Sequence, residues 1–177
     1  MLKKLLEGAG PALRGPKPGS RAGSTIALNA QIDEIAGEAK CSPDSRELIR
    51  ATVLLWHDHL DAAHAIVQNI ENADGSYLHA ILHRREPDYG NAKYWFHRVG
   101  KHPCFPELAR RATSILQGKR EDTLLTELVP GGEWDPFAFV DACERAASRP
   151  DSDPQTQLLR EIQAAEFELV LERVSNG

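Results

Sequence analysis

The stretch from Arg50 to Pro103 decides the fold and reads RATVLLWHDHLDAAHAIVQNIENADGSYLHAILHRREPDYGNAKYWFHRVGKHP. It holds all seven histidines of the 177-residue chain, two of its three tryptophans and all three tyrosines. Beginning just before this stretch, apolar residues recur in steps of three and four, the spacing of one helix face, at Ile49, Val53, Trp56, Leu60, Ala63, Val67 and Ile70. This seam predicts one long helix from about Pro43 to Glu71.

The rest of the chain shows helical spacing and helix-start signals, and no segment alternates as a strand would. Proline at the first helical position follows Ser42, Asp135 and Asp153, which are all residue types that cap helices. Further helices are expected over residues 26–40, 76–86, 91–99, 106–116, 123–129 and 137–147, and from 154 onward. We therefore predict an all-α, single-domain bundle of antiparallel helical hairpins over residues 26–177, preceded by a basic Gly/Pro-rich arm over residues 1–25.

Composition limits which binding partners and which cellular location are expected for this protein. A net charge of −5 argues against broad nucleic-acid binding, although residues 1–25 are basic. The N-terminus lacks the apolar segment of a secretory signal, and the longest apolar run is too short to cross a membrane. The three cysteines, Cys41, Cys104 and Cys143, are widely spaced and indicate reduced thiols in a cytoplasmic protein. The last helix is also long enough to contact a second copy, so a homodimer is an open expectation.

A polar row accompanies the apolar seam of the predicted long helix. His57, Asp61, His64 and Gln68 repeat the seam's steps one residue further along, which places them about 100° around the helix. The sequence Asn72-Ala-Asp-Gly75 predicts a chain reversal. If the two helices pair antiparallel around this turn, His83 lies opposite His64, Glu86 opposite Asp61, and His79 opposite Gln68.

This pairing predicts a candidate metal site formed by Asp61, His64, His83 and Glu86. Imidazole and carboxylate ligands suit divalent zinc, manganese, iron or nickel. Bound to such an ion, the protein would be a metal-dependent hydrolase, lyase or oxygenase, with His57 or His97 as general base because imidazole titrates near neutrality.

A metal-free alternative uses the same region as a pocket for a small polar or anionic ligand. Arg84 and Lys93 would then supply the positive charge, while Trp56 and Tyr94 would form the walls beside His79. A purely structural hydrogen-bonded layer explains the same residues, so the sequence leaves all three interpretations open. Motifs for nucleophilic catalysis and for nucleotide-binding phosphate loops are missing from the sequence.

Two resemblances concern the same part of the chain. Asp88, Tyr89, Ala92, Phe96 and Pro103 resemble the second half of a tetratricopeptide repeat, which implies helical-hairpin packing over residues 88–103 and a protein-interaction module as a further function. Longer segments resemble an uncharacterised protein family of bacteria and fungi, which implies no particular activity. These segments are Trp56-His57-Asp58, His83-Arg84-Arg85-Glu86, residues 91–96, residues 99–103 and Trp134-Asp135-Pro136.

Overall fold

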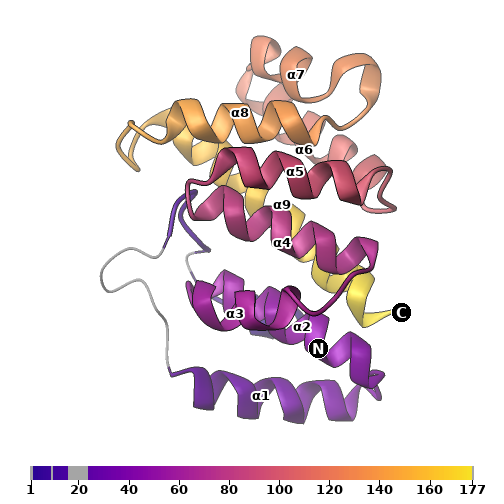
Figure 1. Cartoon of the computed structure of the whole chain (residues 1–177). Coiled ribbons are helices and arrows are strands. Elements are labelled where there is room, and N and C mark those ends of the chain that lie inside the picture. Colours follow the sequence, from indigo (N-terminus) through magenta and orange to yellow (C-terminus); the bar gives the residue numbers. More distant parts are fainter. Residues whose placement is uncertain (1, 9, 16–23, 177) are drawn as a thin grey trace.

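The computed structural model describes residues 2–8, 10–15 and 24–176, and these residues form helices and loops without any strand. The all-α fold class is therefore confirmed. The elements, drawn in Figure 1, are the 3₁₀-helix η1 (Leu2–Leu6), α1 (Thr25–Glu38), α2 (Pro43–Trp56), α3 (Leu60–Val67), α4 (Ala73–Arg85), α5 (Tyr89–Val99), α6 (Phe105–Lys119), α7 (Asp122–Leu128), the 3₁₀-turn η2 (Pro130–Gly132), α8 (Pro136–Ala146) and α9 (Pro154–Ser175). Within the described residues, no helix is long and apolar enough to span a membrane.

The helices stack in an order close to that of the chain. α1 packs on α2, α3 packs on α4, α4 on α5, and α5 on α8, while the long α9 runs behind this stack and contacts α2, α6 and α8 (Figure 1). The core is continuous through these layers, and Ile49, Leu54, Leu78, Phe139 and Phe167 are all at most 1% exposed. The described part of the N-terminal arm joins this core through η1, which packs on α9, α1 and α2.

The predicted long helix from Pro43 to Glu71 is wrong, because the chain bends between α2 and α3. Asp58 adopts a positive φ of 63°, a left-handed conformation that aspartate tolerates better than most residues. Its carboxylate pairs with the buried guanidinium of Arg85, so a tertiary contact accompanies the bend. The apolar seam survives on both sides of the bend, since Val53 and Ala63 are fully buried.

The chain reverses slightly earlier than the sequence predicts. Asn72 caps α4 by accepting a hydrogen bond from the Gly75 amide at 2.8 Å, so the expected turn residues form the first turn of the helix. Gly75 is required there because a side chain would come within 2.5 Å of Ile70. The reversal itself occupies residues 68–72.

Two consecutive arginines of α4 are buried against acids from other elements. Arg84 forms a salt bridge with Glu166 of α9, and both side chains are fully buried. The Tyr77 hydroxyl donates to the same carboxylate at 3.1 Å. Arg85 pairs with Asp58 and donates to the Leu55 carbonyl. These contacts tie α4 to α9 on one side and to the α2–α3 bend on the other.

The Glu166→Gln substitution should strongly destabilise the fold, because it leaves the Arg84 guanidinium buried without a compensating charge. We expect a loss of about 3–5 kcal/mol in the free energy of unfolding, measured by urea denaturation.

The matched control is Glu168→Gln, two residues further along α9. Glu168 pairs with Arg111 at the surface, where its side chain is 41% exposed, so this change should cost less than about 1 kcal/mol. Equal losses for the two variants would show that the buried pair has no special role.

Candidate metal-binding site

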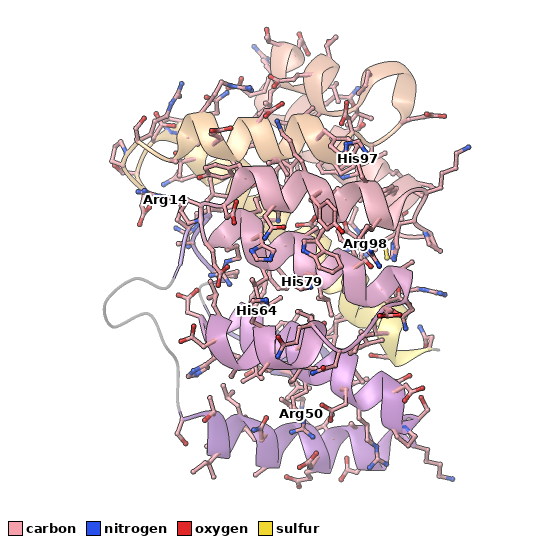
Figure 2. The ribbon with its side chains drawn as sticks, viewed as in Figure 1. Arg14, Arg50, His64, His79, His97 and Arg98 are labelled. Atoms are coloured by element: carbon pink, nitrogen blue, oxygen red, sulfur yellow. The ribbon has the colours of Figure 1, made fainter. Side chains whose placement is uncertain are left out.

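Three histidines from two helices converge between α3 and α4. His64 of α3 lies with its Nε2 atom 3.1 Å from Nε2 of His79 on α4, and the two rings meet edge-on. Figure 2 labels both side chains. The ring of His83, one turn further along α4, is centred 5.5 Å from that of His64. One potential ligand atom from each of the three histidines lies within 4.8 Å of the others.

Local packing explains why these side chains meet. Ala63 and Val67 bury one face of α3 in the core, so the adjacent His64 lies at the edge of that face, toward α4. His79 and His83 are four residues apart and therefore lie on the same side of α4. The two rings stack with their centroids 4.8 Å apart.

Residues of α5 hold the two α4 histidines in place. Trp95 stacks on His79 with the ring centroids 3.8 Å apart. The Arg98 guanidinium lies over the Trp95 ring, 5.2 Å from its centre. The Asn91 amide nitrogen lies 3.1 Å from Nε2 of His83, where it can donate to a neutral imidazole. The Trp95 ring and the Asn91 amide therefore hold His79 and His83 in place.

Burial keeps the α4 histidines neutral. His79 is 4% exposed and His83 is 6% exposed, whereas His64 is partly open to solvent. Desolvation, together with the nearby His83 and His64, lowers the pKa of His79 to about 4. The pKa of His83 is also lowered, chiefly by burial, although Glu86 acts in the opposite direction. Neutral imidazoles have the free lone pairs that metal binding requires.

The carboxylates predicted for the metal site lie at different distances from the histidines. Glu86 is next to the cluster, with Oε2 3.2 Å from Nδ1 of His83, but the two groups lack hydrogen-bond alignment. Asp61 is exposed and lines a separate hollow of about 200 Å³ with Thr25 and His59. The structure therefore brings together His64, His83 and Glu86 of the predicted set, adds His79, and leaves Asp61 outside.

The residues predicted to bind an anionic ligand do not line one pocket. Arg84 is buried against Glu166, and Lys93 forms an ion pair with Asp141 of α8. Trp56 is buried edge-on against the Phe167 ring, with the centroids 5.6 Å apart.

The remaining predicted ligand residue, Tyr94, is 54% exposed on α5 and contacts the ring of Trp95. Of the predicted ligand residues, only His79 belongs to the histidine cluster.

The two predicted general bases also lie outside the cluster. His57 Nε2 donates to the Leu5 carbonyl at 2.9 Å, so this histidine anchors η1, and burial lowers its pKa. His97 is exposed on α5 and packs against the Phe137 ring with the centroids 4.5 Å apart.

Comparison with known proteins gives no further information about the histidine cluster. A scan against protein-family models and searches of curated proteins and of solved structures found no match to this chain. The pattern that identifies His79 was nevertheless in the sequence, as the spacing His-x-x-x-His over residues 79–83. We therefore take the three-histidine cluster as the candidate site.

In chelator-treated protein, the imidazole of His79 should stay neutral from pH 7 to pH 5. Because its native pKa lies below the value of about 6.5 in an unfolded chain, protonation favours unfolding. The stability that His79 contributes is complete above about pH 6.5 and is lost progressively as the pH falls toward 4.

Proton NMR of the His79 ring, identified by its loss in His79→Gln, measures this directly. A His79 signal that titrates with a midpoint near pH 6.5 would contradict the burial argument.

Proposed function

We propose that this protein binds a divalent transition-metal ion, with zinc as the best fit, through His64, His79 and His83. The observation that carries the proposal is the approach of three imidazoles within 4.8 Å, with two of them buried. Among the described residues, Nδ1 of His79 and Nδ1 of His83 are buried without a hydrogen-bond partner, so hydrogen bonds within the protein satisfy these rings only in part.

The spacing of the nitrogens supports zinc. Zinc binds histidine at about 2.0–2.1 Å, and tetrahedral geometry then puts neighbouring ligand nitrogens about 3.3 Å apart. The 3.1 Å separation of the His64 and His79 Nε2 atoms is close to this value. A side-chain movement of His83 toward the other two rings would complete the set.

Three histidines leave one coordination position of a tetrahedral ion unfilled. This composition is typical of catalytic rather than closed structural zinc sites, and the ion there lowers the pKa of a bound water to about 7. His64 is the partly exposed member of the cluster, so the open position is expected on its side. A hydrolase or lyase acting on a polar substrate is the enzyme class that such a site would serve.

Charge favours this proposal over an anion pocket that uses Arg84 and Lys93. Both cations are already paired, Arg84 with Glu166 and Lys93 with Asp141. Binding an anion through either side chain would first require breaking an existing ion pair, and for Arg84 that pair is fully buried.

The test is elemental analysis of purified, tag-free protein together with zinc titration of the chelator-treated protein. We expect about one metal ion per chain and a rise in the free energy of unfolding of about 2.7 kcal/mol at a free zinc concentration of about 100 times Kd.

The variant His79→Ala should lose this stabilisation, while His97→Ala, which removes an exposed histidine outside the cluster, should retain it. Chelator-treated protein that gains no stability from zinc, or equal losses in both variants, would refute the proposal.

A second prediction concerns the different effects of Glu86 and Asp61 on zinc binding. Glu86 Oε2 lies 3.2 Å from Nδ1 of His83, so a small rotation would let Glu86 accept a hydrogen bond from that ring and orient it rather than bind the ion. Glu86→Gln should therefore keep one zinc per chain but weaken the affinity by about 10- to 100-fold, measured by competition with a chromophoric chelator. Asp61→Asn is the control and should bind zinc as the natural protein does. A larger effect of Asp61→Asn would restore Asp61 to the ligand set.

A further inference from the structure

A second concave surface lies away from the histidines, where the α5–α6 connection faces the loop before α8. It encloses about 460 Å³, within the range typical of small-molecule sites. Three aromatic side chains line it, Phe105, Trp134 and Phe137, together with the charged residues Lys101 and Glu133. We call this surface the aromatic groove. Figure 2 labels His97, which packs against the Phe137 ring.

The walls of the aromatic groove are held from behind. The Phe105 ring contacts Tyr77 at a centroid distance of 5.5 Å, and Trp134 contacts Phe139 at 5.1 Å. Both supporting rings are fully buried in the core. Because these contacts restrict the wall rings before binding, a flat apolar ligand needs to order them only slightly.

The two charges of the groove have opposite signs and do not neutralise one another. Lys101 and Glu133 are exposed, and neither forms an ion pair within the part of the chain that the structure describes. Lys93 of α5, by contrast, pairs with Asp141. The groove therefore presents one cation and one anion to whatever occupies it.

A buried donor without an acceptor adds to this picture. Trp134 is 6% exposed, and its indole Nε1 is buried without a hydrogen-bond partner among the described residues. An unsatisfied buried N–H is costly, and the group can only donate. An acceptor oxygen carried into the groove, reached by a small shift of the indole ring, would remove this cost.

We propose that the aromatic groove binds a small zwitterion that carries an aromatic ring, the chemistry of a free aromatic amino acid. The ring of the ligand packs among Phe105, Phe137 and Trp134. Its carboxylate lies toward Lys101 and the Trp134 indole N–H, and its ammonium lies toward Glu133. The groove shares no residue with the histidine cluster, so this proposal is independent of metal binding.

The test is a titration of the ¹⁵N-labelled full chain with L-phenylalanine, followed by NMR. The Trp134 indole N–H signal, identified by its loss in Trp134→Phe, should move downfield and saturate. We expect Kd on the order of 1 mM for a ligand of this size. Phenylacetate, which lacks the ammonium, and phenethylamine, which lacks the carboxylate, should each bind more weakly.

Single substitutions measure how much each groove residue contributes to ligand binding. Trp134→Phe keeps an aromatic wall but removes the donor, and it should weaken L-phenylalanine binding about tenfold, followed through backbone amide signals. Lys101→Ala should weaken binding of L-phenylalanine about threefold and leave the binding of phenethylamine unchanged. Glu133→Ala should also weaken binding of L-phenylalanine about threefold, but it should leave the binding of phenylacetate unchanged. Lys119→Ala, an exposed lysine outside the groove, is the control.

Two results would overturn the proposal. One is the absence of a saturable shift at roughly ten times the expected Kd. The other is saturable binding that is equal for L-phenylalanine, phenylacetate and phenethylamine, or that Lys101→Ala and Glu133→Ala leave unchanged, because the opposite charges would then have no role.

Discussion

The buried pairing of Arg84 with Glu166 is the constraint on which the position of α4 depends. A fully buried guanidinium needs its carboxylate, so α4 and α9 are held in one relative placement. The neighbouring Arg85 holds α4 to the α2–α3 bend through its ion pair with Asp58. With α4 held from two sides, His79 and His83 are presented to α3 in a defined geometry.

The histidine cluster contrasts with these arginines in its electrostatics. Burial favours the neutral form of His79 and His83, although the partly exposed Glu86 acts in the opposite direction on the pKa of His83. Neutral imidazoles with unpartnered nitrogens form a poor structural network, because each buried nitrogen without a partner is costly. Neutral imidazoles suit a metal ion, which binds their free lone pairs and brings its own charge.

Helix α5 contacts both proposed sites. Trp95 and Asn91 contact the α4 histidines, while Phe96 contacts the Phe137 ring that lines the aromatic groove. Both sites thus depend on the packing of α5 between α4 and α8. They differ in chemistry, since one offers neutral nitrogen donors and the other offers aromatic faces with two exposed charges.

The sequence by itself determined the helical class, most helix starts and the concentration of histidine, because these follow from local spacing and capping. Only the tertiary structure decided the bend at Asp58, the exclusion of Asp61 and the burial of Arg84. Its partner Glu166 is 82 positions away, and Asp58 is 27 positions from Arg85. A local pattern carries no information about such partners, so it can identify the residues of a site without determining which of them meet.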